Sequence, residues 1–225
     1  MTRLPTIELE SSPNPCAAVI WLHGLGADGN DFVPIVSELD LAGCMPIRFI
    51  FPSAPSMPIT WNSGYVMPAW YDISGSDLVS KQDAPGIANS AQAIGELIEE
   101  QHKKGIEYQN IVLAGFSQGC AMALHTGLSF PHKLAGIMAL SGYLPLSDTF
   151  ASIAHKVNQT TPIFMAHGTQ DPVVVIKRGE DSRDLLKACG YTVDWRTYPM
   201  QHSVHPDEIS DISEFLKKVL ALNVA

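Results

Sequence analysis

The sequence predicts an α/β fold in which a mostly parallel, doubly wound sheet carries helices on both faces. Of the 225 residues, 46% are hydrophobic and only 16% are charged, which is the balance of a chain that buries a core. Short apolar runs alternate with helical patterns along the whole length. Gly105, Gly190 and Pro206 stand where those helical patterns should end or begin.

Six runs are expected to form strands, because most are near-continuous apolar stretches typical of strands covered on both faces. They are Ala17–Leu22, Ile47–Phe51, Asn110–Ala114, Leu134–Leu140, Pro162–Ala166 and Thr192–Tyr198. Helical patterns between and after them cover Asp31–Leu39, Pro85–Lys104, Gln118–Leu128, Val175–Ala188 and Pro206–Leu222. No internal repeat, low-complexity tract or linker interrupts this alternation, so we expect one domain over residues 1–225.

Residues 52–82 break the alternation. The segment contains four prolines and no run that is typical of a helix or a strand. It is also unusually apolar, with Trp61, Met67 and Trp70 among its large side chains. Loops this long are uncommon in compact domains unless they serve a function. Two interpretations stay open: an irregular segment packed onto the core, or a lid or wall for an apolar substrate. In the second interpretation, Trp61, Met67 and Trp70 are the expected substrate-binding residues.

Charge and cysteine usage exclude several kinds of partner and cofactor. The formal net charge is −9 without a Lys/Arg cluster, which makes nucleic acid and anionic membranes poor partners. The four cysteines show no CxxC spacing that would predict a disulfide framework or a zinc site. The first residues lack the apolar core of a secretory signal, and Ala17–Leu22 is too short to span a bilayer. We therefore expect a cytoplasmic protein without stable membrane insertion; the sequence carries no signal for or against a homodimer.

The most informative motif is Gly115-Phe116-Ser117-Gln118-Gly119. It follows a predicted strand and opens an alanine-rich helical pattern, which is the strand–turn–helix context of the nucleophile in α/β-hydrolases. The sharp turn forces the serine into a strained conformation, and the flanking glycines remove side chains that would collide there. The serine hydroxyl then stands at a helix N-terminus, where developing negative charge is favoured.

A serine hydroxyl needs a base to take its proton and an acid to orient that base. In this fold the acid and then the histidine follow the serine along the chain, which leaves His202 and His205 as the candidate bases. His202 is favoured because His205 directly precedes a proline at a predicted helix start and suits a surface or capping role. Asp171 is favoured over its rival Asp148, because it lies just beyond a strand whose carboxyl end shares an edge with Ser117 and His202.

Acyl transfer also requires donors for the oxyanion. The N–H of Gln118 should supply one, and the glycine-rich loop after the first predicted strand should supply the second, through the N–H of Leu25. This loop matches neither GxxxxGK[ST] nor GxGxxG, so it does not predict phosphate binding. A metal site formed by His202 and His205 is a weaker alternative, and we expect neither metal nor cofactor.

These motifs together resemble the acyl-protein thioesterase and carboxylesterase family of small α/β-hydrolases, also called the phospholipase/carboxylesterase family. The matching segments cover nearly the whole chain in order: Val19–Gly26, Ala69–Asp72, Leu113–Gly119, Ala139–Gly142, His167–Val174 and Met200–His202. The resemblance implies the triad Ser117, Asp171 and His202, oxyanion donors at Leu25 and Gln118, and an acyl-binding wall around Trp70.

The chain departs from the family pattern at two points. Cys120 stands where the family usually has another glycine, which is expected to narrow the nucleophile turn without abolishing it. Thr2 stands where the eukaryotic branch often carries an acylated cysteine, so membrane anchoring is not implied. The leading hypothesis is a hydrolase for small-molecule esters of short to medium acyl chains. The alternatives are the same triad acting on protein thioesters or lysophospholipids, and a non-catalytic binding module on a hydrolase scaffold.

Overall fold

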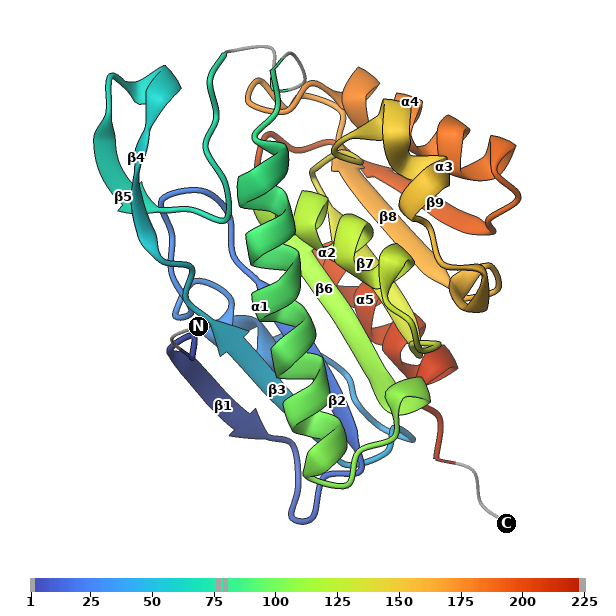
Figure 1. Cartoon of the computed structure of the whole chain (residues 1–225). Helices are drawn as coiled ribbons and strands as arrows, with labels where there is room; N and C mark the ends of the chain where they lie inside the picture. Colours follow the sequence, from blue (N-terminus) through green and yellow to red (C-terminus); the bar gives the residue numbers. More distant parts are fainter. Residues whose placement is uncertain (1–2, 76–77, 79–80, 223–225) are drawn as a thin grey trace.

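The computed structural model describes residues 3–75, 78 and 81–222, and its centre is a seven-stranded sheet (Figure 1). The strand order is β1-β3-β2-β6-β7-β8-β9, and every neighbouring pair is parallel except β1 with β3. The strands are β1 (Thr6–Glu10), β2 (Ala17–Leu22), β3 (Ile47–Pro52), β6 (Ile111–Phe116), β7 (Gly136–Leu140), β8 (Ile163–Gly168) and β9 (Val193–Tyr198). The predicted doubly wound α/β architecture is therefore confirmed.

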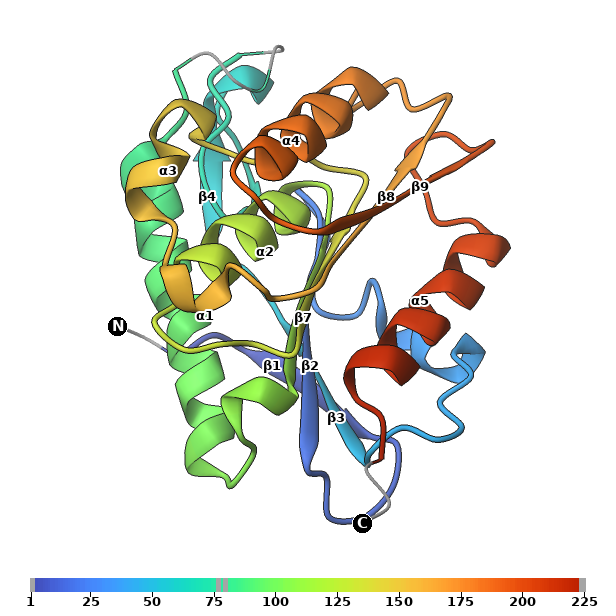
Figure 2. The same ribbon diagram turned by 90° about the vertical axis from the view of Figure 1, so that its right-hand side faces the viewer.

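Helices cover both faces of this sheet (Figure 2). Helices α1 (Ala84–Lys103), α2 (Gln118–Ser129), α3 (Phe150–Ile153) and α4 (Ile176–Ala188) lie on one face, whereas α5 (Pro206–Val219) lies on the other beside the 3-10 helix η1 (Val33–Glu38). Four further short 3-10 helices lie in the described connections: η2 (Thr60–Asn62), η3 (Tyr108–Asn110), η4 (Ser147–Thr149) and η5 (Lys156–Asn158). Along the chain, η1 covers one face, α1 to α4 cover the opposite face, and α5 returns to the face of η1.

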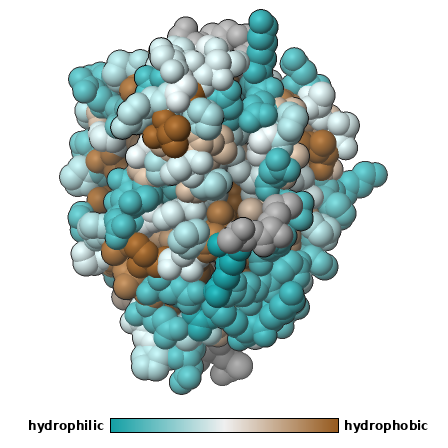
Figure 3. Space-filling model, turned by 60° about the vertical axis from the view of Figure 1, so that its left-hand side comes forward, coloured by the Kyte–Doolittle hydropathy of each residue, from teal (hydrophilic) through white to brown (hydrophobic). Residues whose placement is uncertain are grey.

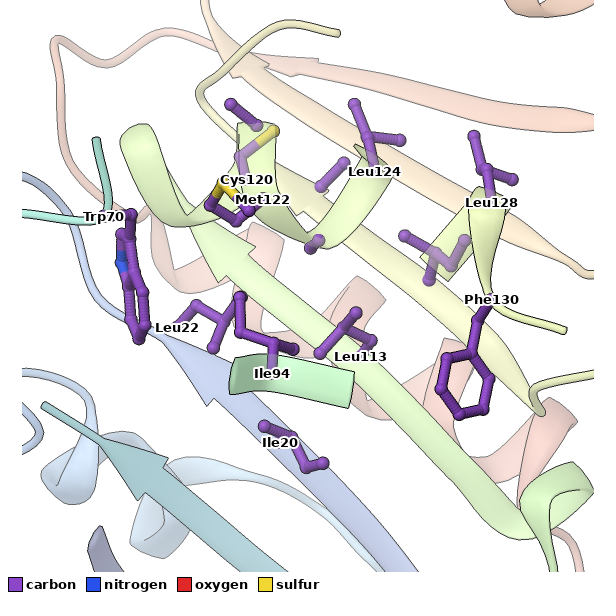
Figure 4. Packing of buried hydrophobic residues seen from close by; sticks show 14 of the residues in the cluster. Ile20, Leu22, Trp70, Ile94, Leu113, Cys120, Met122, Leu124, Leu128 and Phe130 are labelled. Atoms are coloured by element: carbon purple, nitrogen blue, oxygen red, sulfur yellow. The ribbon is translucent and has the colours of Figure 1, made fainter. Parts of the chain in front are cut away.

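The core is divided by the sheet into two apolar layers. On the α1 and α2 side, Ile20 and Leu22 of β2 pack with Ile94 of α1 and Met122 of α2 (Figure 4). All four side chains are completely inaccessible to solvent. Each such aliphatic side chain contributes about 1.5–3 kcal/mol relative to an exposed position. This packing fixes the strand ends that carry the candidate site.

Helix α5 begins at a capping box. The His205 side chain accepts a hydrogen bond from the N–H of Asp207, and the Glu208 carboxylate accepts one from the N–H of His205. Pro206 occupies the first helical turn, where its missing N–H costs nothing. The capping role predicted for His205 is confirmed, and the cap fixes the chain directly after His202.

The sequence interpretation missed the edge strand β1. Its residues alternate between half-buried and exposed positions, with two glutamates among five residues. An antiparallel edge strand needs no continuous apolar run, so the criterion that located the central strands does not apply to it.

Two expected segments differ in the structure. The helix predicted over Asp31–Leu39 is only the six-residue 3-10 helix η1, with Pro34 in its first turn; a proline disfavours the α conformation of the residue before it, so no α-helix extends back to Asp31. The irregular segment 52–82 contains a β-hairpin of β4 (Ser56–Ile59) and β5 (Tyr65–Pro68). Two of its four prolines, Pro58 and Pro68, lie in this two-stranded ribbon, where few ladder bonds are lost. Residues 76–77 and 79–80 of this segment lie outside the described part of the chain.

The face that carries β1 and the β4–β5 hairpin is largely hydrophilic, with apolar residues in small separate patches (Figure 3). Single exposed apolar residues of this kind are normal on protein surfaces. Among the described residues, no helix combines the length and the apolar character needed to cross a membrane.

Candidate active site

Ser117 occupies a sharp turn between β6 and α2. Its backbone has φ 56° and ψ −116°, a strained conformation for a residue with a side chain. A Cβ at Gly115 would collide with the backbone of Gly119, and a Cβ at Gly119 would collide with the carbonyl oxygen of Leu22. Only glycine therefore fits on either side of the turn, as the sequence predicted.

His202 lies between Ser117 and Asp171. Its Nε2 is 2.9 Å from the Ser117 Oγ, and its Nδ1 is 2.6 Å from Oδ2 of Asp171. Because the carboxylate can only accept, the Nδ1–H donates to it and leaves Nε2 to accept the serine proton. The three residues follow β6, β8 and β9, whose carboxyl ends lie at one edge of the sheet.

The Asp171 carboxylate is held in its ionised form. Its Oδ1 accepts hydrogen bonds from the N–H groups of Val173 and Val174, at 2.8 and 2.9 Å. Burial acts to raise the pKa of Asp171, but His202 and these two N–H groups outweigh it and hold the pKa below its usual value. The side chain is thus a buried negative charge directed at the imidazole.

His167 supports the turn that carries Asp171. Its Nε2–H donates to the carbonyl oxygen of Val174 at 2.7 Å, and burial lowers the pKa of the imidazole. A neutral His167 leaves His202 as the partner of Asp171.

The rival candidates for the catalytic acid and base, Asp148 and His205, do not take part in this hydrogen-bonded series. Asp148 is an exposed residue of η4, after β7, and His205 caps α5. Within the described ranges, no group of three or more His, Cys, Asp or Glu residues could hold a metal ion.

The loop after β2 lies close to Ser117. A Cβ at Gly24 would lie 3.4 Å from the Cβ of Ser117, so the two backbones are close. His23 orders this loop: its Nε2 accepts from the N–H of Ala54 at 3.0 Å and its Nδ1–H donates to the carbonyl oxygen of Gly24 at 2.7 Å. Burial lowers the pKa of His23, which agrees with a neutral ring that both donates and accepts.

Two backbone N–H groups are available near Ser117. Gln118 is the first residue of α2, where an N–H has no partner within its helix. The N–H of Leu25 donates to no other group in the part of the chain that the structure describes. Leu25 and Gln118 both line the hollow beside Ser117. The predicted oxyanion donors therefore lie on the same side of the serine.

The side chain of Gln118 fastens the segment 70–71 to the nucleophile turn. Its Oε1 accepts from the N–H of Trp70 and its Nε2 donates to the carbonyl oxygen of Tyr71, both at 2.8 Å. The Trp70 indole N–H donates to the carbonyl oxygen of His23 at 2.9 Å. Trp70 is 1% exposed and stands beside Leu22 at the end of β2 (Figure 4).

A cavity of about 160 Å³, here called the Ser117 pocket, opens beside the serine. Its walls combine apolar side chains with the polar residues of the turn: Leu25, Trp61, Tyr71, Ile73, Leu78, Tyr143, Val173 and Val174 lie around Ser117, Gln118 and His202. Of the three expected substrate-binding residues, only Trp61 is part of this wall. Trp70 packs behind it, and the Met67 sulfur lies against Gly26 of the loop after β2.

Sequence reasoning did not select Tyr71 and Tyr143 as site residues. Their hydroxyls are 3.0 Å apart although the residues are 72 positions apart in the chain. Tyr71 lies directly after Trp70 in a matched family segment, which is the signal that could have identified it. No local pattern marks Tyr143.

Cys120 leaves the turn intact. It is completely buried, and a Cβ at Gly142 would lie only 2.5 Å from the Cβ and Sγ of Cys120. The glycine opposite therefore provides the space that the cysteine occupies. Burial also raises the pKa of the Cys120 thiol, which keeps it protonated and unreactive.

The fold and these side chains define a serine hydrolase of the α/β-hydrolase class. The model of the phospholipase/carboxylesterase family matches residues 5–220, so the chain belongs to this family of ester-cleaving hydrolases.

Curated relatives span nearly the whole chain. Acyl-protein thioesterase 1 of Neurospora crassa is 43% identical over 98% of this chain and 94% of the relative. Acyl-protein thioesterase 1 of Gibberella zeae is 40% identical over 97% of each chain.

Solved structures of similar proteins have the same fold. Arabidopsis thaliana SOBER1 superposes with a TM-score of 0.85 at 29% identity, covering 91% of this chain and 99% of that one. Acyl-protein thioesterase 2 of Zea mays gives a TM-score of 0.84 at 28% identity, covering 96% of this chain and 99% of that one.

Proposed function

We propose that this protein cleaves carboxylic esters of short to medium acyl chains through an acyl-enzyme formed on Ser117. The observation that carries the proposal is the hydrogen-bonded series Ser117–His202–Asp171 at the mouth of an apolar pocket. The cytoplasmic location predicted from the sequence stays a prediction, as does the expectation of one domain.

The reaction follows from the positions of these groups. His202 Nε2 takes the proton of the Ser117 hydroxyl as its Oγ bonds to the acyl carbon, and Asp171 stabilises the imidazolium. The resulting oxyanion accepts hydrogen bonds from the N–H groups of Leu25 and Gln118. His202 then gives the proton to the leaving alcohol or thiol, and water attacks the acyl-enzyme in the same manner.

The acyl chain is assigned to the Ser117 pocket. Ser117 and both proposed oxyanion donors line this cavity, so an acyl carbon bonded to the serine would direct its chain into it. The walls are mainly apolar, and burial of each methylene contributes about 0.8 kcal/mol until the space is filled. A volume of about 160 Å³ favours short to medium chains over long ones.

Hydrolysis of protein thioesters is the second candidate, and the names of the curated relatives favour it. The same atoms would act, with a cysteine thiol as the leaving group.

A direct test combines active-site labelling with a substrate series. A fluorophosphonate should label Ser117, as located by peptide mass spectrometry, and octanoate should protect against labelling. Oxyesters and thioesters of equal acyl length should then be compared by kcat/KM. Labelling at another residue, or none on folded protein, would refute the proposal.

A further inference from the structure

A second hollow borders His202 on the side away from the Ser117 pocket. This groove, here called the His202 groove, has a volume of about 450 Å³ and is walled by η1, by the loop after β9 and by the first turn of α5. Figure 2 shows α5 on the sheet face opposite α1 and α2. Among the residues that the structure describes, His202 alone lines both hollows.

The position of the groove suits a leaving group. His202 has to deliver a proton to the departing oxygen or sulfur, so that atom must lie against the imidazole. Ser117 lines the first pocket but not the groove. Phe116 lines the groove beside His202, and the centroids of the two rings are 4.7 Å apart. An ester whose acyl part fills the Ser117 pocket therefore directs its other half into the groove.

The lining of the groove combines an apolar floor with an acidic rim. Phe32, Ile35 and Ile209 belong to the apolar layer on this face of the sheet. Asp31 and Glu38 are the charged residues at the rim, and no Lys or Arg lines the described wall of the groove. Among the described residues, neither carboxylate forms an ion pair. Asp31 is exposed at the rim, and desolvation by its neighbours raises its pKa.

We propose that the His202 groove binds the leaving-group half of the substrate and selects a peptide that carries positive charge beside the acylated side chain. The inference rests on the proposed function, because it requires His202 to protonate the leaving group. The volume exceeds that of the Ser117 pocket nearly threefold, which suits a peptide segment better than a small alcohol. Aliphatic stems of Lys or Arg would cover the apolar floor while their charged ends reach Asp31 and Glu38.

The test uses blocked dipeptides that share one S-octanoyl cysteine and differ in the next residue. That residue is lysine, norleucine or glutamate, and the released thiol is measured. We expect kcat/KM to fall in that order, with the lysine peptide favoured over the glutamate peptide by roughly tenfold at low salt and less at high salt.

Charge-neutralising variants assign this preference to the groove. Asp31→Asn and Glu38→Gln should each reduce the lysine-to-glutamate ratio by about two- to fivefold, chiefly through KM, and the double variant should bring it near unity. Glu107→Gln is the matched control: it removes one exposed negative charge just before β6, at the opposite end of the sheet, and should leave the ratio unchanged.

Other outcomes separate the two proposals. The groove assignment is overturned if the wild type shows a lysine-to-glutamate ratio near unity, or if the double variant keeps the wild-type ratio. Turnover of the norleucine peptide in that case still supports the proposed hydrolase function. A second outcome also overturns the assignment of a peptide to the groove: the enzyme prefers octanoylcholine over its neutral 3,3-dimethylbutyl analogue but does not discriminate among the three peptides. The leaving group would then be a small cationic alcohol. Loss of fluorophosphonate labelling and of all turnover is instead a failure of the proposed function.

Discussion

The Ser117 pocket and the His202 groove meet at one imidazole but differ in size and in charge. The pocket holds about 160 Å³, and the rings of Trp61, Tyr71 and Tyr143 form much of its wall. The groove holds about 450 Å³ and has two carboxylates at its rim. In the pocket, we expect recognition to rest on apolar burial, which scales with chain length. In the groove, we expect charge to contribute as well, and this contribution to depend on salt.

The difference shows how one site can treat the two halves of an ester separately. The binding free energy from apolar burial increases with the length of the acyl chain, but it discriminates only weakly between chains that differ by one methylene. Charge at the rim discriminates between leaving groups of opposite sign. Substitutions on one side should therefore change specificity for one half of the substrate, whereas substitutions at the shared residues should affect both halves equally.

The largest effect is expected at the residue that bonds to the substrate. Ser117→Ala should lower kcat by roughly 10⁴–10⁶-fold on every substrate, whatever its acyl chain or leaving group. The loss should be the same for oxyesters and thioesters in steady-state assays. Folding should be retained, as checked by circular dichroism, because only a hydroxyl is removed. A folded variant that keeps most of its esterase activity would refute the assignment.

The next largest effect concerns the acid. Asp171→Asn should preserve the shape of the site but present an amide to His202, which disfavours the required tautomer and costs on the order of 10⁴-fold in kcat. Asp148→Asn and His205→Gln serve as controls and should remain within about tenfold of the wild type, since the hydrogen bonds of the His202 ring go to Asp171 and Ser117. If Asp148→Asn were the crippling change, the acid would be misassigned while the nucleophile would stand.

Much of this architecture could be predicted because it is encoded locally. The central strands are apolar runs that the sheet buries on both faces, and β2, β3 and β7 lie within two residues of their predicted bounds. Ser117, Asp171 and His202 could be placed together because each follows a strand of one parallel sheet. Topology thus converts distant sequence positions into neighbours without any knowledge of side-chain contacts.

The remaining parts of the site depend on contacts between segments that no local pattern relates. The Gln118 side chain binds the backbone at Trp70, 48 positions away. That bond, together with the bond from the indole to His23, turns the large side chain of Trp70 into the core. Apolar character alone could not distinguish a tryptophan behind the pocket wall from Trp61 in it.

The next prediction contrasts these two tryptophans. Trp61 is 54% exposed and lines the Ser117 pocket, so Trp61→Ala should reduce the preference for octanoyl over acetyl esters by roughly three- to tenfold with little loss of stability. Trp70→Ala should instead destabilise the fold by about 3–5 kcal/mol and lower kcat/KM by a similar factor at every chain length. The measurements are kcat/KM over an acyl series and urea unfolding. If kcat/KM lost its dependence on acyl-chain length in Trp70→Ala but not in Trp61→Ala, Trp70 would belong to the wall that contacts the acyl chain.

The last effect concerns stability rather than catalysis, on the groove side of the sheet. Glu208 lies on the first turn of α5, completely buried, between groove residues Pro206 and Ile209. Its Oε2 accepts from the N–H of His205 at 3.2 Å, whereas Oε1 has no partner among the described residues. Burial raises the pKa of Glu208 to about 8, and the nearby charge of Asp211 adds to this effect.

The direction of the pH dependence follows from this raised pKa. An unfolded glutamic acid ionises near pH ~4.3, whereas the folded protein keeps the Glu208 proton up to about pH 8. The unfolded state therefore loses the proton first, and Glu208 lowers the free energy of unfolding by up to ~1.4 kcal/mol for each pH unit within that window. Glu208→Gln has no proton to lose, so its stability relative to the wild type should rise steadily from pH 5 to pH 8 in urea titrations. Glu214→Gln, an exposed change on the same helix, should show a nearly constant difference over this range. A constant difference for Glu208→Gln as well would mean that the buried carboxyl ionises at its ordinary pKa, and that the groove side is no more sensitive to pH than the pocket side.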